Sequence, residues 1–141
     1  MKYVVDASVA LKWVLTEPDS PKALSIRHDF RLQLSELLAP DIFPVEVARA
    51  LTRAERKGII KSPQAVLLLA DVLSTPIPLH PYRALLPKAV ATSSAMRCGV
   101  YDCLYLALAE RESCALITAD DKLVKNLGAT FPFIISLAAM P

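Results

Sequence analysis

The chain has 141 residues, enough for one hydrophobic core but not for two ordinary domains, so we expect a single domain over residues 1–141. Hydrophobic residues make up 54% and charged residues 21%, a balance that argues against a disordered chain. The net charge of +2 permits nucleic acid as a partner without indicating one.

Apolar runs end at a charged residue or a proline before they reach the roughly 18 residues of a membrane span. Asp6 interrupts the N-terminal run, so we expect no signal peptide and a cytoplasmic location. The three cysteines, Cys98, Cys103 and Cys114, lack CxxC spacing and have only two histidines beside them. This pattern argues against both a disulfide framework and a zinc site.

The first half of the chain alternates between short apolar runs and helical patterns. Lys2–Val5 is rich in Val and Tyr and too short for a helix, which predicts a strand that turns directly into a helix. The further predicted elements in this half are a helix over 9–15, a helix over 23–38 that begins near Ser20 and Pro21, a short strand at Leu38 and Ala39, a helix over 43–57 stopped by Gly58, and a helix that Ser62 and Pro63 open and that runs to Leu73.

The second half continues the alternation. Three prolines within Thr75–Pro81 leave room only for a very short or edge strand. Residues 103–109 are apolar almost all round, which predicts a helix buried in the centre of the domain. The other predicted elements are a helix over 85–96 ended by Gly99, a strand over 115–118, a helix over 122–127 and a strand over 131–135. The whole pattern predicts an α/β layer fold with a mainly parallel sheet.

Acidic side chains stand where such a fold places its ligands, at the carboxyl ends of the strands. Asp6 ends the first predicted strand, and Asp120 follows the next-to-last strand by two residues. If these two strands are parallel neighbours, both acids lie at one edge of the sheet. Asp102 opens the buried helix, and Glu46 lies in the first turn of its own helix.

Each acid also has a purely structural explanation. Asp6 and Asp102 could be N-caps, which stabilise a helix end by about 1 kcal/mol, and taken singly this is the favoured interpretation. Asp120 could cap the following helix or occupy a turn. Glu46 shares a helix face with two arginines, so an exposed, ion-paired face explains it as well as a function does.

Together the four acids favour a metal site. One pair of carboxylates about 4 Å apart repels by about 4 kcal/mol at an effective dielectric constant of about 20, and a hard divalent cation removes that repulsion. Mg²⁺ or Mn²⁺ takes oxygen ligands, keeps several waters, and supports the hydrolysis of phosphate esters. The hydroxyls of Ser8 and Thr118 could orient Asp6 or a water molecule, although helix capping explains Ser8 equally well.

Other chemistries fit the sequence less well. The three glycines are scattered, which excludes a phosphate-binding loop. A phosphoaspartyl hydrolase needs a second acid two residues after Asp6, where this chain has Ser8. No nucleophile elbow surrounds a serine, which argues against a Ser-His-Asp triad.

Four acid-bearing segments resemble those of PIN-domain ribonucleases. They are VDAS at 5–8, VEVA at 45–48, YDCLYLALA at 101–109 and TAD at 118–120. Each segment alone is a weak signal, but four acids in this order and in these local settings are a specific one. The chain resembles this family over essentially its whole length, and in particular the toxins of VapBC-type toxin–antitoxin modules.

The resemblance implies a PIN-like three-layer fold in which helices flank a short, mainly parallel sheet of about five strands. It also implies Mg²⁺- or Mn²⁺-dependent cleavage of RNA, inhibition by a small antitoxin protein, frequent homodimers, and metal binding by Asp6, Glu46, Asp102 and Asp120. Asp121 is a second acid directly after Asp120, so either could face the metal, although the register after the strand favours Asp120. Pro44 starts the helix close to Glu46, which leaves open how far that carboxylate reaches.

Two alternatives stay open: a non-catalytic PIN-fold module that binds RNA or protein, and a nuclease that acts on DNA. Trp13 and the run 66–69 offer apolar surface for a protein partner, although core packing is the favoured explanation. Several cations could line an RNA groove or form an ordinary exposed helix face: Arg27, Arg31, Arg49, Arg53, Arg56, Lys57 and Lys61.

Overall fold

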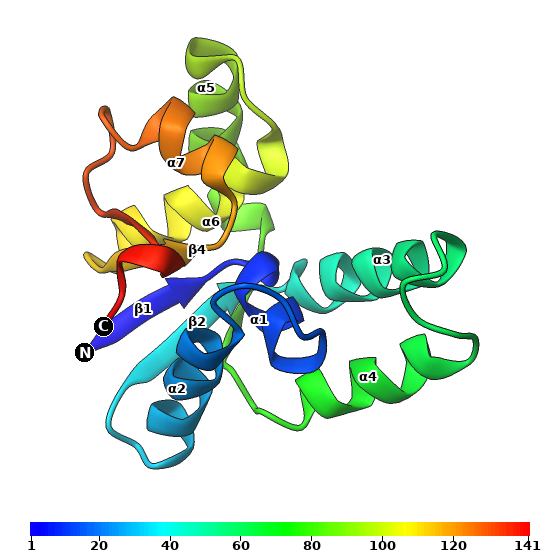
Figure 1. Ribbon diagram of the computed structural model, residues 1–141. Coiled ribbons are helices and arrows are strands. Elements are labelled where there is room, and N and C mark those ends of the chain that lie inside the picture. Colours follow the sequence, from blue (N-terminus) through cyan, green and yellow to red (C-terminus); the bar gives the residue numbers. More distant parts are fainter.

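Five strands form one sheet, and every neighbouring pair in it is parallel. In the computed structural model, which describes all 141 residues, the order across the sheet is β3-β2-β1-β4-β5 (Figure 1). The strands are β1 (Lys2–Val5), β2 (Glu36–Pro40), β3 (Leu79–His80), β4 (Ala115–Thr118) and β5 (Ile134–Ser136). The predicted short parallel sheet of about five strands is confirmed.

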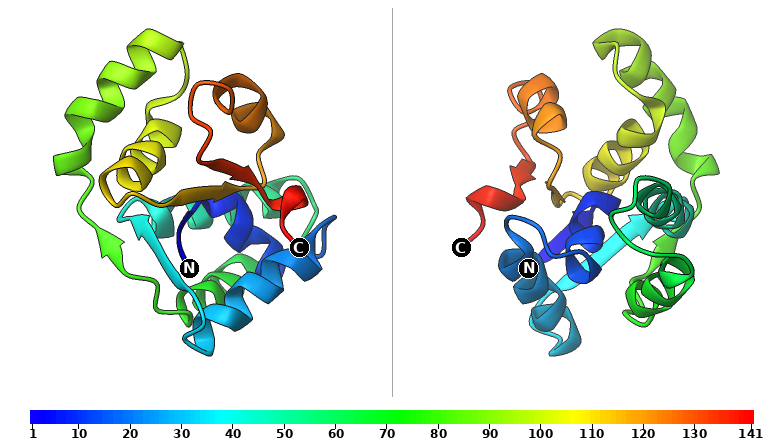
Figure 2. Two further views of the ribbon diagram at one scale, coloured as in Figure 1. Left: turned by 90° about the vertical axis from the view of Figure 1, so that its left-hand side faces the viewer. Right: turned by 45° about the vertical axis from the view of Figure 1, so that its right-hand side comes forward.

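Helices cover both faces of the sheet, which confirms the three-layer α/β fold (Figures 1 and 2). Right-handed crossovers from β1 to β2 and from β2 to β3 move in one direction across the sheet, and those to β4 and β5 move in the other. The first group of helices therefore lies on one face: α1 (Ala7–Val14), α2 (Ser20–Arg31), α3 (Phe43–Arg56) and α4 (Gln64–Leu73). The second group lies on the opposite face: α5 (Leu86–Met96), α6 (Val100–Arg111) and α7 (Asp121–Leu127).

The hydrophobic core lies on both faces of the sheet, and one half of it is built around α6. This helix packs across β1, β2 and β4 and is covered on its other side by α5. All residues from Cys103 to Ala109 are buried, as their apolar pattern predicts. None of the α-helices combines the length and the hydrophobicity needed to cross a bilayer.

Two predicted elements have different bounds in the structure. The predicted helix over 23–38 is too long, because α2 ends at Arg31 and Gln33 adopts a positive φ of 60°. The following residues extend as β2, whose Glu36, Leu37 and Leu38 pair with β1. The predicted strand over 131–135 is also misplaced: Phe131 is part of a turn, and β5 begins at Ile134.

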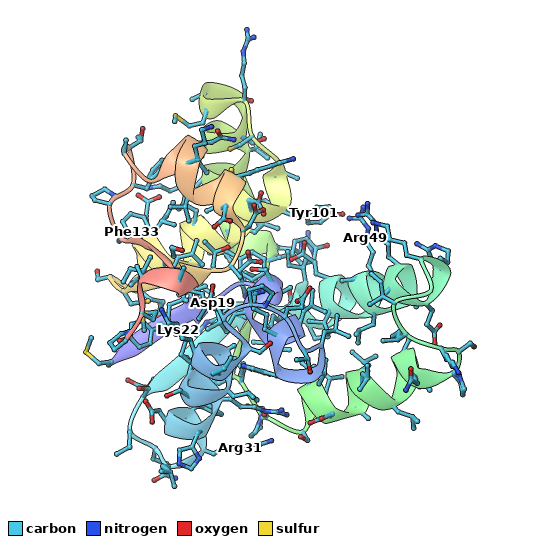
Figure 3. The ribbon with its side chains drawn as sticks, in the orientation of Figure 1. Asp19, Lys22, Arg31, Arg49, Tyr101 and Phe133 are labelled. Atoms are coloured by element: carbon cyan, nitrogen blue, oxygen red, sulfur yellow. The ribbon has the colours of Figure 1, made fainter.

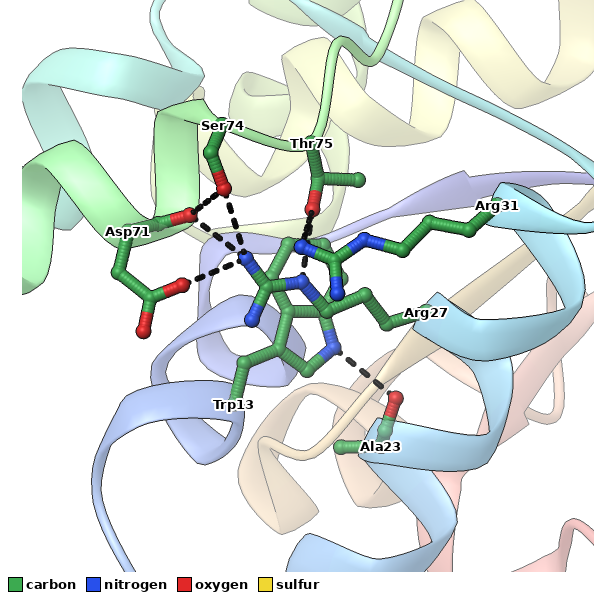
Figure 4. Close-up of polar contacts among 7 residues, drawn as sticks. All are labelled: Trp13, Ala23, Arg27, Arg31, Asp71, Ser74 and Thr75. Atoms are coloured by element: carbon green, nitrogen blue, oxygen red, sulfur yellow. Dashed lines mark hydrogen bonds and ion pairs between the residues drawn. The ribbon is translucent and has the colours of Figure 1, made fainter.

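Arg27 lies in the interior, which contradicts its place among the RNA-groove candidates. Its side chain is 5% exposed, and its guanidinium lies 4.9 Å from the ring centroid of Trp13 (Figure 4). It donates to Thr75 Oγ1 at 2.7 Å and to Asp71 Oδ1 at 2.9 Å. The cluster joins α1 and α2 to the C-terminal end of α4. Arg31, the next turn along, also donates to Thr75, at 3.3 Å.

The apolar residues offered as an interface divide into two groups. Trp13 is 7% exposed and donates its indole N–H to the Ala23 carbonyl at 2.9 Å, so its predicted core position is confirmed. Val66 and Leu67 are 64% and 66% exposed, so core packing is wrong for them. Their helix lies at the periphery, where only Ala65 and Val72 are buried.

Candidate active site

Asp6 and Asp120 lie at the point where the direction of the sheet's crossovers reverses. β1 and β4 are the neighbouring strands there, with Val5 paired to Ile117, and the Asp6 amide donates to the Ile117 carbonyl at 3.1 Å. Asp6 follows β1 directly and Asp120 follows β4 by two residues. Their backbones therefore emerge together at the carboxyl edge, where open α/β sheets bind ligands.

Two helices begin beside this edge and contribute the other two acids. Glu46 is in the first turn of α3 and Asp102 in the first turn of α6. One groove of about 590 Å³ is lined by Asp6, Glu46, Asp102 and Asp120 together. Glu46 reaches this groove although Pro44 starts its helix only two residues earlier. Asp121 is exposed and does not line the groove.

Asp6 is held by two hydroxyl groups. Thr118 Oγ1 donates to Asp6 Oδ2 at 2.7 Å, and Ser8 Oγ donates to the same oxygen at 3.1 Å. Both hydroxyls also accept backbone N–H groups from the segment after β4, Ser8 from Ala119 at 2.9 Å and Thr118 from Asp120 at 3.0 Å. Ser8 and Thr118 therefore lock the end of β1 to the end of β4 and fix the rotation of the Asp6 carboxylate.

Helix capping does not account for Asp6 or Asp102. Asp6 occupies the N-cap position of α1, but its side chain makes no capping hydrogen bond. Asp102 lies inside α6, whose N-cap is Gly99. Asp120 does cap α7: its Oδ1 accepts from the amides of Lys122 at 3.0 Å and Leu123 at 3.4 Å. That cap orients the Asp120 carboxylate and uses only one of its two oxygens.

The groove disfavours negative charge on its acids. Burial, followed by the charges of Asp6, Asp120 and Glu46, raises the pKa of Asp102 from 3.8 to about 7. Burial also raises the pKa of Asp6, although the hydrogen bonds from Thr118 and Ser8 partly offset it, and it raises the pKa of Glu46. An arrangement that penalises its own carboxylates favours a bound proton or a bound cation.

Sequence reasoning missed Tyr105, which lies beneath the groove on α6. Its hydroxyl and Glu46 Oε1 are both buried without a hydrogen-bond partner. The two groups are close enough for Tyr105 to lower the pKa of Glu46, but they do not reach hydrogen-bonding geometry. The only sequence signal was the spacing of three residues from Asp102, which places both side chains on one helix face.

The chemistry of the donors fits a hard, hydrated cation. The lining residues include five carboxylates, the four predicted acids and Glu17, but no histidine or cysteine, and Glu46 Oε1 is a buried acceptor without a donor. No three acidic, histidine or cysteine side chains converge closely enough to form a complete protein-only ligand set. Mg²⁺ retains several waters and needs only one or two carboxylates in direct contact, so the groove fits that ion better than one that demands a closed protein cage.

Comparisons with known proteins agree with this geometry. The model of the family described as PIN domain matches residues 3–127. The chain is 30% identical to Ribonuclease VapC3 of Pyrobaculum aerophilum over 138 residues, which cover 96% of the chain and 99% of that protein. It is also 30% identical to Ribonuclease VapC12 of Mycobacterium tuberculosis over 125 residues, covering 89% and 92% of the two chains.

Solved structures show the same fold. The crystal structure of PAE2754 from Pyrobaculum aerophilum superposes with a TM-score of 0.68 at 21% identity, covering 98% of this chain and 93% of the other. The crystal structure of VapBC2 from Rickettsia felis, bound to a DNA fragment from their promoter, gives a TM-score of 0.67 at 17% identity, covering 96% and 97%.

Proposed function

The chain belongs to the PIN-domain family, where its relatives include VapC ribonucleases, and we propose that it is a metal-dependent endoribonuclease and the toxin of a toxin–antitoxin pair. The observation that carries the proposal is the groove itself. Four carboxylates from four distant segments of the chain line it at the reversal point of the sheet. We also propose that it acts in the cytoplasm, where RNA substrates are found.

The residues that would hold Mg²⁺ or Mn²⁺, directly or through its bound waters, are Asp6, Glu46, Asp102 and Asp120. When bound, the ion lowers the pKa of a water molecule and neutralises charge on the phosphodiester. Ser8 and Thr118 keep the Asp6 carboxylate in a fixed rotation. The N-cap bonds do the same for Asp120. Because both supports are backbone-anchored, the acids at the strand ends are preorganised before substrate arrives.

A cleavage assay with end-labelled RNA tests this function. We expect cleavage with Mg²⁺ or Mn²⁺, none in EDTA, and a loss of at least about 100-fold in Asp6→Asn and Asp102→Asn, because each removes a charge that the cation needs. Asp120→Asn and Asp121→Asn form a matched pair of neighbouring acids, of which only the first lines the groove. Full activity of Asp102→Asn, or cleavage in EDTA, would contradict the proposal.

The alternatives are separated by two measurements. A non-catalytic module would bind RNA or protein but show no metal-dependent cleavage, and calorimetry would detect no Mn²⁺ binding that depends on Asp6. The presence of all four acids in one groove favours the enzyme. A nuclease that acts on DNA would cut labelled DNA at least as well as RNA of the same sequence when the two are incubated side by side.

The proposed partners are a small antitoxin protein and a second copy of the chain. The exposed Val66 and Leu67 on α4 supply apolar surface of the kind that protein partners cover. A Leu67→Glu substitution should therefore weaken self-association or antitoxin binding without altering the groove, which is formed by other residues. Light scattering at several concentrations measures the first effect, and co-purification with the antitoxin measures the second.

A further inference from the structure

Three cations follow one another along the wall of the acid-lined groove. Arg49, Arg53 and Lys57 are spaced four residues apart on α3 and its C-cap, so they share one helix face and advance by about 6 Å per step. All three line the groove that contains the carboxylates. Glu46, one turn before Arg49, is the acid at which the row begins. We call these three residues the phosphate row.

No residue of the phosphate row forms an ion pair within 4 Å, although the charge of Arg49 acts on Glu46. The ion pairs of the structure use other cations: Lys2, Lys12, Arg27, Lys88 and Arg111. Each residue of the row is exposed. Of the cations that the sequence suggested for an RNA groove, only Arg49, Arg53 and Lys57 line it.

The rest of the groove fits one nucleic acid strand. Its other lining residues are mainly apolar, among them Leu11 on α1, Leu15 directly after that helix, and Ala50 and Ala54 on α3. Glu17, the one further acid, pairs with Lys12 at 3.7 Å. Because cations stand on one wall only, the groove complements a single phosphate backbone, whereas a duplex presents two.

An aromatic side chain stands beside the acidic end. Tyr101 directly precedes Asp102 and is 53% exposed. In the view of Figure 3, Tyr101 and Arg49 project toward one another from α6 and α3. Exposed aromatic rings beside cationic grooves are the surfaces on which unpaired bases stack.

We propose that Arg49, Arg53 and Lys57 bind consecutive phosphates of a single-stranded RNA and lead it to the carboxylates. The proposal rests on the proposed ribonuclease function and adds the path of the substrate. Helix α3 then has two roles, because it supplies the acid Glu46 at its start and the backbone contacts along its length.

Fluorescence anisotropy with a labelled single-stranded RNA oligonucleotide, in EDTA and over a series of salt concentrations, tests the path. The slope of log K against log salt is negative, and each lost phosphate contact on a single strand reduces its magnitude by about 0.7. The triple variant Arg49→Ala, Arg53→Ala, Lys57→Ala should therefore reduce the magnitude of the slope by about 2 and weaken binding by roughly tenfold or more at low salt. Replacing the two arginines by lysine should retain most of the slope.

A charge-matched control separates the row from general attraction. Arg56→Ala with Lys61→Ala removes as much charge as Arg49→Ala with Arg53→Ala, but both control residues are exposed and lie outside the groove. The salt slope should change only when Arg49 and Arg53 are replaced. Equal losses in the two pairs, an unchanged triple variant, or equal affinity for duplex RNA would each overturn the proposal.

The same set of variants distinguishes failure of the path from failure of the function. If Asp102→Asn abolishes cleavage while the triple variant binds RNA like the wild type, the ribonuclease function stands and the phosphate row is wrong. If Asp102→Asn still cleaves while the triple variant loses its salt slope, the row binds RNA and the assignment of the catalytic carboxylates is wrong.

Discussion

Asp102→Asn should stabilise the metal-free protein at alkaline pH while it abolishes activity. The folded chain raises the pKa of Asp102 to about 7, through burial and then through the charges of the other groove acids, whereas 3.8 is the ordinary value. Between these two values the folded chain retains a proton that the unfolded chain has released. The free energy of unfolding therefore falls as pH rises from about 4 to about 7, and asparagine removes this loss.

The size of the effect follows from the two pKa values. At about 1.4 kcal/mol per pH unit, the raised pKa of Asp102 lowers the free energy of unfolding by about 4 kcal/mol at pH 8 and by about 2 kcal/mol at pH 5. These are upper limits, because the asparagine amide is itself partly buried and loses water contacts. We expect a gain of about 2–4 kcal/mol at pH 8 and a clearly smaller gain at pH 5.

Urea unfolding in EDTA at pH 5 and pH 8, monitored by circular dichroism, measures the difference, with Asp121→Asn as the exposed control. Adding Mg²⁺ should reverse the order of stability, because a ligand that binds only the folded wild type stabilises it. A variant that is no more stable than the wild type at pH 8, or a gain that does not change with pH, would refute the electrostatic reasoning.

Three further outcomes follow from single contacts. Arg27→Ala should lower the free energy of unfolding by about 2–4 kcal/mol in urea titrations, since it removes a buried guanidinium that packs on Trp13 and donates to the buried Thr75 and the half-exposed Asp71; a loss below about 1 kcal/mol would show that the cluster is not stabilising. Thr118→Val removes the 2.7 Å donor to Asp6, so the pKa of that acid rises further and the acidic limb of the pH–activity profile shifts to higher pH, with Thr118→Ser restoring it. Tyr105→Phe should leave metal-free stability unchanged or raise it by up to about 1 kcal/mol in the same titrations, because its buried hydroxyl has no hydrogen bond to lose.

Local sequence was sufficient to locate the candidate acids. Asp6 and Asp120 each follow a short apolar run at a strand end, and Asp102 heads a run too apolar for a surface helix. These signals depend on neighbouring residues only. Parallel pairing then places the carboxyl ends of the strands at one edge of the sheet, so the acids that follow them lie close together. The sheet and its layers were predictable for the same reason.

The errors arose where distant contacts decide the structure. Leu32, Leu34 and Leu38 extend the apolar pattern of α2, but pairing with β1 draws this segment into the sheet. Arg27 carries a charge and resembles a surface residue, because its partner Asp71 is remote in the sequence. Leu67 is hydrophobic enough for a core, but it lies on the face of α4 opposite the buried Ala65 and Val72. In each case the deciding neighbour is absent from the local pattern.

The dispersal of the groove acids along the chain has a consequence for protein synthesis. Asp6 is the first of the four acids to emerge from the ribosome, and Asp120 is the last, because it follows β4, the strand that pairs with β1. A nascent chain that stops before β4 has no partner for one side of β1 and at most three of the four acids. A nuclease that needs all four acids, as proposed above, stays inactive until Asp120 has been made, so products truncated before β4 would not threaten the RNA of the cell that makes them.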